Sequence, residues 1–219
     1  DKERLVVLKV FTDKAKLHSD NIVSFVEILG QLSPPVGTKG TVEFDGIEVI
    51  DGQALIIRPW LPNNVANMLK GMNYASTVAT NMMSECLATL SQLEKSEIYP
   101  IELKLENFLV NNEFELVLAD IGIRHALFII ADSPQEAIAD YFDINTLHNH
   151  CLKEIQSQAN CTAFSCATAF YRICAKGQAL SSTQNVAELV ELRQDGQISI
   201  PIQLNGEIHS KLLKEITGL

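Results

Sequence analysis

The sequence predicts an α+β protein with two unequal units, a strand-rich unit over residues 1–61 and a larger, mainly helical unit over residues 62–219. Two observations favour this class. Short apolar, β-branched runs around one helical segment fill the first unit. In the second unit, most apolar residues recur three or four positions apart, which is the period of a helix. Pro59 and Pro62 mark the expected boundary.

The first unit is expected to hold three strands and one helix. Residues 4–11 are apolar around a single lysine, which is typical of a strand. Residues 19–32 begin with a Ser-Asp pair suited to a helix N-cap, show helical spacing, and precede two prolines that end the helix. Residues 41–50 and 53–60 predict two strands, because the Asp-Gly pair between them indicates a hairpin.

The second unit begins with helices. Residues 64–71 predict a short helix, and residues 76–95 predict a long one with an apolar stripe. Two short apolar runs, residues 108–110 and 115–120, predict strands that are joined by a turn at an Asn-Asn pair.

Further along the chain, one segment stands out by its apolar character. Residues 161–174 are apolar on almost every side, which is typical of a buried helix. Residues 185–194 and 207–216 are amphipathic and predict surface helices. Residues 120–160 show a mixed pattern that favours no particular element.

The composition excludes two classes of partner. Seventeen Lys and Arg against 27 Asp and Glu give a net charge of −10, which repels the phosphates of nucleic acids. Every apolar run is shorter than the roughly 18 residues that a membrane span requires, so we expect no membrane-spanning helix. The chain has no initiator methionine or signal segment before its first strand. We therefore expect a fragment of a cytoplasmic protein.

The cysteines do not indicate a metal site. There are five of them, without the paired spacing of zinc ligands. The nearest cluster is His148, His150 and Cys151, and residues two apart on a helix point to different sides. Reduced thiols in the cytosol are the simpler interpretation.

One stretch carries a resemblance to a known family. Residues 102–110, ELKLENFLV, are followed by LADIGI at residues 118–123. Together they resemble the catalytic loop H-R-D-L-K-x-x-N of the eukaryotic protein kinases and the metal-binding D-F-G that follows it after a short hairpin. VVLK at residues 6–9 resembles the kinase motif V-A-I-K, and residues 177–201 resemble the stretch around kinase helix G.

The resemblance implies a bilobal protein kinase-like fold and a role for five residues. Lys9 falls on the lysine that grips the nucleotide phosphates, and Asn107 and Asp120 fall on the two magnesium ligands. Glu102 falls on the catalytic base, and Lys104 on the lysine two positions after it. ATP and Mg²⁺ are therefore the candidate cofactors. The implied small lobe begins at its third strand, without a glycine-rich loop, and the large lobe ends near helix H.

Several kinase features are missing around Lys9. Val7 replaces the alanine of V-A-I-K, and its methyl groups point where adenine packs in kinases. Phe25 falls on the position of the glutamate that pairs with the lysine. Glu27 lies about 200° further round the helix and does not substitute for that glutamate. We therefore expect Lys9 to lack its partner.

The catalytic loop and the substrate platform also depart from the kinase pattern. Pro100, Ile101 and Glu102 stand in place of H-R-D. A glutamate carboxylate extends one methylene further, and a displacement of about 1 Å can lower the rate about a hundredfold. His-Asn-His at residues 148–150 replaces the A-P-E motif, and Thr162 replaces the aspartate that anchors the platform.

These departures predict a pseudokinase, which is a catalytically inactive kinase-like domain that serves as a scaffold or allosteric partner in a protein complex and requires no cofactor. The alternative is a weak, divergent Ser/Thr protein kinase in which Glu102 is the base and Lys9, Asn107 and Asp120 hold ATP and Mg²⁺. A structural subunit of a large assembly is a third possibility.

Two regions point to protein partners. The apolar strand over residues 4–11 is expected to have an open edge that a partner or a further segment covers. Trp60, between the two units, is expected to pack or to contact a partner. Outside the kinase pattern, Lys9 would be an edge-strand lysine and Asp120 would begin a strand-ending turn.

Overall fold

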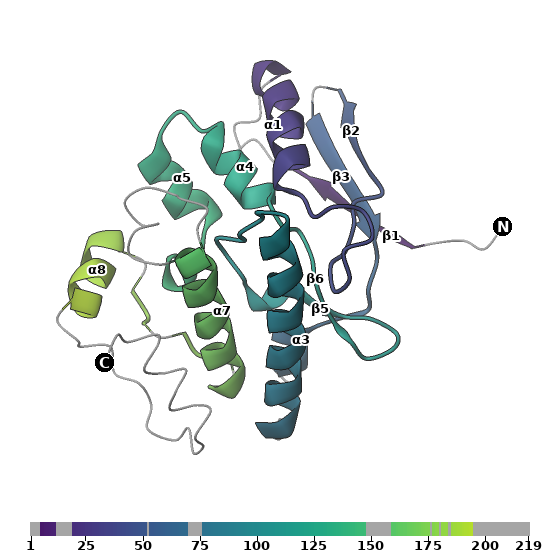
Figure 1. The fold of residues 1–219 in the computed structure, drawn as a ribbon. Coiled ribbons are helices and arrows are strands. Elements are labelled where there is room, and N and C mark those ends of the chain that lie inside the picture. The colour runs from purple at the N-terminus through teal and green to yellow at the C-terminus, as the bar shows by residue number, and fades with distance from the viewer. Residues whose placement is uncertain are drawn as a thin grey trace.

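The computed structural model describes residues 5–11, 19–51, 53–69, 76–147, 159–175, 177–179, 181–183 and 185–194. These residues form two small antiparallel sheets and a set of helices, so the protein is α+β (Figure 1). The strands are β1 (Val6–Val10), β2 (Gly46–Ile50), β3 (Gln53–Pro59), β4 (Asn63–Asn64), β5 (Phe108–Val110) and β6 (Leu116–Leu118). The helices are α1 (Ser19–Leu32), α2 (Val65–Leu69), α3 (Ser76–Lys95), α4 (Ile123–Ile129), α5 (Pro134–Tyr141), α7 (Ala159–Cys174) and α8 (Val186–Gln194), with short 3-10 helices η2 (Leu105–Asn107) and η3 (Ile144–Thr146).

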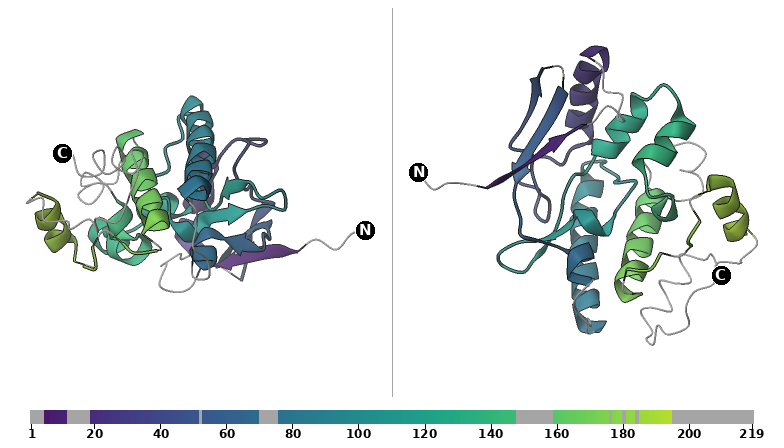
Figure 2. Two further views of the ribbon diagram at one scale, coloured as in Figure 1. Left: turned by 90° about the horizontal axis from the view of Figure 1, so that it is seen from below. Right: turned by 180° about the vertical axis from the view of Figure 1, so that it is seen from behind.

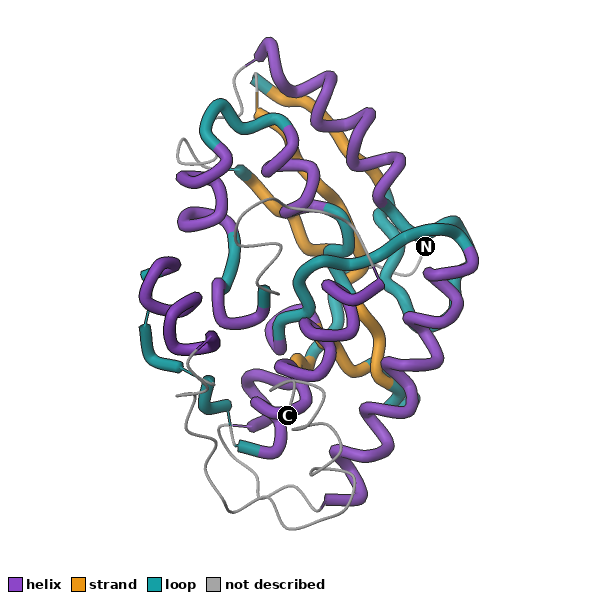
Figure 3. The backbone as a smooth tube through the Cα atoms, turned by 60° about the vertical axis from the view of Figure 1, so that its left-hand side comes forward, coloured by secondary structure: helices purple, strands orange, loops and turns teal. Residues whose placement is uncertain are grey.

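The first sheet has the order β1-β3-β2 and packs against α1. Phe25 and Leu29 of α1 share a buried apolar cluster with Ile56 of β3 and with residues of α4. Along β3 every second side chain is buried, because one face of the strand is turned toward this cluster. The helix over residues 19–32 and the hairpin of β2 and β3 confirm the sequence predictions. Figure 3 shows the strands of the molecule in two separate groups.

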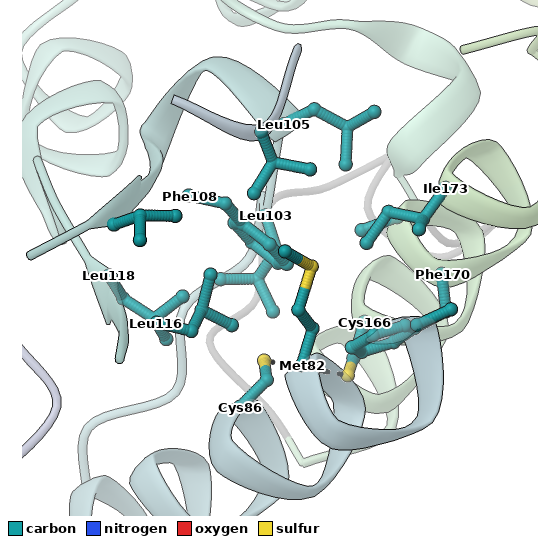
Figure 4. Packing of buried hydrophobic residues seen from close by; sticks show 14 of the residues in the cluster. Met82, Cys86, Leu103, Leu105, Phe108, Leu116, Leu118, Cys166, Phe170 and Ile173 are labelled. Carbon is teal, nitrogen blue, oxygen red and sulfur yellow. Dashed lines mark hydrogen bonds between the residues drawn. The ribbon is translucent and has the colours of Figure 1, made fainter. Parts of the chain in front are cut away.

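A second core lies between α3, α7 and the second sheet, whose order is β4-β5-β6. The two long helices lie side by side in Figures 1 and 2. Phe108 of β5 and Phe170 of α7 meet edge to face with their ring centroids 6.4 Å apart. Cys86 and Cys166 face each other with sulfurs 3.9 Å apart (Figure 4). The helices expected over residues 76–95 and 161–174 are therefore confirmed, and so are the two strands around the Asn-Asn turn.

The segment after α1 joins the two sheets, which corrects the strand expected over residues 41–50. Thr41 forms a parallel bridge with Leu118 of β6, and only residues from Gly46 onward pair with β3. Gly40 has a φ of +82°, and a Cβ there would lie 2.0 Å from the Thr89 hydroxyl oxygen of α3. The close approach to α3 and the bridge to β6 therefore require an irregular chain before β2.

The region that the sequence left open forms short helices. Residues 120–147 contain α4, α5 and η3, and α4 packs on both α1 and α5. At the start of η3, the Asp143 side chain accepts a hydrogen bond from the Asn145 N–H at 3.1 Å. Such short helices depend on local caps and tertiary contacts, so they leave little periodicity in the sequence.

Several sequence expectations lie outside the described residues. They concern His148, His150 and Cys151, the end of the helix-G-like stretch at residues 195–201, and the amphipathic segment over residues 207–216. Among the helices that the structure describes, none combines the length and the apolar character that crossing a membrane demands.

Candidate functional site

The β5–β6 hairpin brings two of the predicted site residues together. Asn107 ends η2 just before β5, and Asp120 follows β6. The backbone N–H of Ala119 donates to the carbonyl oxygen of Asn107 at 2.9 Å, which joins the two ends of the hairpin. Gly122 then turns the chain with a φ of +86°, and a Cβ there would lie 2.8 Å from the carbonyl oxygen of Leu32, at the end of α1. The turn after Asp120 is therefore packed against α1.

Asp120 accepts hydrogen bonds from two cations of the first sheet. Its Oδ2 lies 2.5 Å from Lys9 Nζ, and its Oδ1 lies 3.1 Å from Arg58 Nε. The Asp120 side chain is only 4% exposed, whereas that of Lys9 is 35% exposed. A buried carboxylate requires such compensation, because removing a charge from water is costly unless it is paired.

Lys9 pairs with a residue that the sequence expectation, which concerned only a glutamate of the following helix, did not foresee. The partner is Asp120, 111 residues further along the chain, and not a side chain of α1. Phe25, at the position of the expected glutamate, is fully buried and meets Phe11 edge to face at 5.2 Å. Glu27 is exposed. Because α1 offers an apolar face here, the lysine pairs with the second unit.

Arg58 is the site residue that the sequence reasoning missed. It occupies a buried position of β3, in alternation with Ala54 and Ile56. Its Nη1 also donates to the carbonyl oxygen of Pro59 at 3.0 Å. An arginine on the inward face of an apolar strand was a usable signal, since a buried guanidinium needs an anionic partner. The sequence alone did not show which carboxylate would meet it.

Glu102, at the position of the catalytic base, takes part in a second buried ion pair. Its Oε1 accepts from Arg124 Nη1 at 2.9 Å and from the Asp143 N–H at 2.8 Å. The side chain is 3% exposed. Burial raises the pKa of Glu102, while Arg124 and the Asp143 N–H act in the opposite direction. Asp143 in turn pairs with Arg172 of α7 at 2.8 Å, so the ion pairs connect the loop with α4 and α7.

α7 supports the loop before η2 through a hydroxyl group. The Leu103 N–H donates to the Ser165 Oγ at 2.6 Å, and both residues are buried. Thr162, at the position of the expected kinase aspartate, is also buried, one helical turn before Ser165. Ser165 therefore connects the loop to the buried helix without a carboxylate.

A small cavity lies between the loop and the turn after β6. Its lining includes Asn107, Asp120 and Glu102. Its volume of about 30 Å³ is enough for about one water molecule. His125 also lines this cavity, and burial lowers its pKa to about 4. The structure therefore brings the predicted base and both predicted magnesium ligands to one place, with Lys9 reaching it through Asp120.

In this structure two cations engage the carboxylate that the resemblance assigns to magnesium. Mg²⁺ requires oxygen ligands in octahedral geometry, and each oxygen of Asp120 already accepts from a cation. The described part of the chain contains no group of three or more Asp, Glu, His or Cys side chains that could hold a metal ion together. Lys104, near the same loop, has its pKa lowered mainly by burial and further by Arg124. Lys9 and Arg58 are the two cations that the structure places on the Asp120 carboxylate.

Comparisons with models of protein families and with curated protein sequences find no match to this chain. The contacts of the site are internal ion pairs in which the carboxylates of Asp120 and Glu102 are buried, whereas Lys9 and Arg124 are partly exposed.

Proposed function

We propose that the chain is a pseudokinase, a kinase-like module that transfers no phosphate and serves as a scaffold or allosteric partner in a protein complex. The observation that carries this proposal is that two buried carboxylates are already held in ion pairs. Asp120 is paired with Lys9 and Arg58, and Glu102 is paired with Arg124. Phosphoryl transfer depends on positioning and on electrostatic stabilisation of the transferred group. Both buried carboxylates would have to leave their cationic partners before they could take part.

The exposed apolar side chains of β1 support a role in protein binding. Val6, Leu8 and Val10 are about half exposed, and β1 is an edge strand of the described sheet. Apolar residues beside an open strand edge favour burial by another chain or segment. Trp60 directly follows β3 and is 46% exposed, and its backbone N–H donates to the carbonyl oxygen of Leu5. Proteins are therefore the proposed partners, and the unpaired spacing of the cysteines supports a cytoplasmic location.

A weak Ser/Thr protein kinase is the second candidate. The meeting of Lys9, Asn107 and Asp120 at the end of the β5–β6 hairpin favours it, because ATP-dependent kinases use these residue types. It would require Arg58 to release Asp120, and Arg124 to release Glu102. The proposed pseudokinase requires no cofactor, whereas this second candidate requires ATP and Mg²⁺.

Transfer of radiolabelled phosphate from ATP separates the two candidates. The purified chain is incubated with Mg²⁺ and generic protein substrates, beside an Asp120→Asn variant that removes the carboxylate but keeps its size. We expect equal, background incorporation in both samples. Incorporation that is above background and disappears in Asp120→Asn would favour the kinase. A Glu102→Gln variant would then show whether Glu102 is the base.

A further inference from the structure

The turn between β5 and β6 displays an aromatic side chain in solvent. Phe114 is 87% exposed, and its backbone has a φ of +61°. This left-handed conformation is uncommon for residues other than glycine and is strained for a phenylalanine. In Figure 1 the turn extends beyond its two strands as a teal loop. Exposure and backbone strain therefore coincide at one residue.

Hydrogen bonds hold this turn in one shape. The Asn111 Oδ1 accepts from the N–H groups of Glu113 at 3.0 Å and Glu115 at 2.8 Å. The Phe114 N–H donates to the carbonyl oxygen of Asn111 at 3.1 Å, and the Asn111 N–H donates to that of Glu115 at 3.0 Å. The Leu116 N–H then donates to the Glu85 carboxylate of α3 at 2.6 Å. The exposed ring thus stands on a turn that is tied to the core.

Such an arrangement reduces the entropy lost on binding. A side chain that is presented on an ordered turn has less freedom to lose than one on a flexible loop. Strained backbone conformations persist where the surroundings determine them, and they are frequent at binding sites. Aromatic residues also dominate the binding energy of many interfaces. Phe114 therefore has the properties of an interface anchor.

The charges around the ring define the complementary surface. Glu113 and Glu115 flank Phe114 and are both exposed. The chain as a whole carries a net charge of −10. A partner surface with lysine or arginine side chains around an apolar pocket would match the ring and the two glutamate carboxylates beside it. The opposite charges would also attract the two proteins before they come into contact.

We propose that Phe114 is the anchor through which this protein docks to a partner protein that carries a ring-sized apolar pocket rimmed by lysine or arginine. This inference deepens the proposed scaffold function and rests on it. A second copy of the chain fits less well, because it carries the same net charge of −10 and like charges at an interface repel each other.

The first step of the test is photo-crosslinking. p-Benzoylphenylalanine is placed at position 114 of the full chain, and an extract of the cells that make the protein is irradiated. The matched control has the same probe at position 36, since Val36 is 90% exposed in another loop. We expect a partner protein that is crosslinked from position 114 and not from position 36. Equal yields at both positions, or crosslinks only between copies of the chain, would overturn the proposal.

The second step measures the affinity of the purified captured protein. Phe114→Ala is expected to weaken binding roughly tenfold or more, as truncation of an interface anchor does. Glu113→Gln should lower the association rate and reduce its dependence on salt. Wild-type affinity in Phe114→Ala would overturn the proposal.

A third variant separates binding from folding. Phe114→Gly suits the left-handed backbone, so it should unfold at a temperature equal to or above that of the wild type and still lose binding. A merely structural role of the ring predicts the reverse pattern. These outcomes are independent of phosphate transfer, so a failure here is distinguishable from a failure of the proposed function.

Discussion

The apolar cluster beneath the first sheet and the core between α3 and α7 are built differently. In the core between α3 and α7, large side chains such as Phe108 and Phe170 are fully buried. In the first sheet, α1 covers one face, but Val6, Leu8 and Val10 of β1 remain exposed. The two regions meet through the apolar contacts of α1 and β3 with α4, through the bridge of Thr41 to β6, and through the cations on Asp120. Apolar packing therefore builds both regions, and charged contacts add to it where the first sheet meets Asp120.

The largest expected effect is in the helical core. Phe170→Ala should lower the free energy of unfolding by about 3–5 kcal/mol, because the ring is fully buried and its removal leaves a cavity. Phe164 lies on the same helix but is only half-buried. Phe164→Ala is the matched control and should cost less than Phe170→Ala. Equal losses in urea denaturation would contradict this placement.

A pH effect of somewhat smaller size is expected from His125. Burial lowers its pKa from 6.5 to about 4, so the unfolded chain binds the proton more readily than the folded one between these values. The stability that the neutral imidazole contributes above pH 6.5 is lost as the pH falls to about 4, by up to about 3 kcal/mol. Burial raises the pKa of Glu102, which acts in the opposite direction.

Because of this opposing contribution, the measurement compares wild type with His125→Gln. The difference between their unfolding free energies is followed from about pH 7 to about pH 4. We expect the variant to lose less stability than the wild type over this range. Parallel curves would show that the imidazole is not shielded from solvent.

The smallest expected effect on the free energy of unfolding comes from replacing the two cations that pair with Asp120. Arg58 is mostly buried, so Arg58→Met should lower the free energy of unfolding by about 2 kcal/mol through the lost hydrogen bond to a charged group. The Lys9 side chain is 35% exposed, so Lys9→Met should cost about 1 kcal/mol or less. A larger loss in Lys9→Met, measured by urea denaturation, would show that the first sheet is held mainly by the lysine.

The long elements of the fold were predictable from the sequence. α1, α3 and α7 have apolar residues at regular spacing, or on all sides, over at least fourteen residues. The short helices of residues 120–147 were not, because caps such as Asp143 and tertiary contacts determine them. The expected strand over residues 41–50 failed for a similar reason, since Gly40 and Thr41 pair with β6.

The candidate site was predictable only in part. Motif spacing indicated Lys9, Asn107 and Asp120, and the structure brings Lys9 to Asp120. The contact of Arg58 with Asp120 spans 62 residues, and no local pattern carries it. The exposure of Phe114 was also hidden, because the sequence pattern placed this residue only between two expected strands and did not indicate whether its ring is buried.

The central claim is that the Asp120 carboxylate is engaged by Lys9 and Arg58, and a thermal-shift titration tests it most directly. The chain is melted with increasing ATP, with and without Mg²⁺, beside Asp120→Asn. Because Lys9 and Arg58 already pair with both carboxylate oxygens, Mg²⁺ should add no stabilisation to that given by ATP alone. A rise in melting temperature that requires both ATP and Mg²⁺ and disappears in Asp120→Asn would contradict the account.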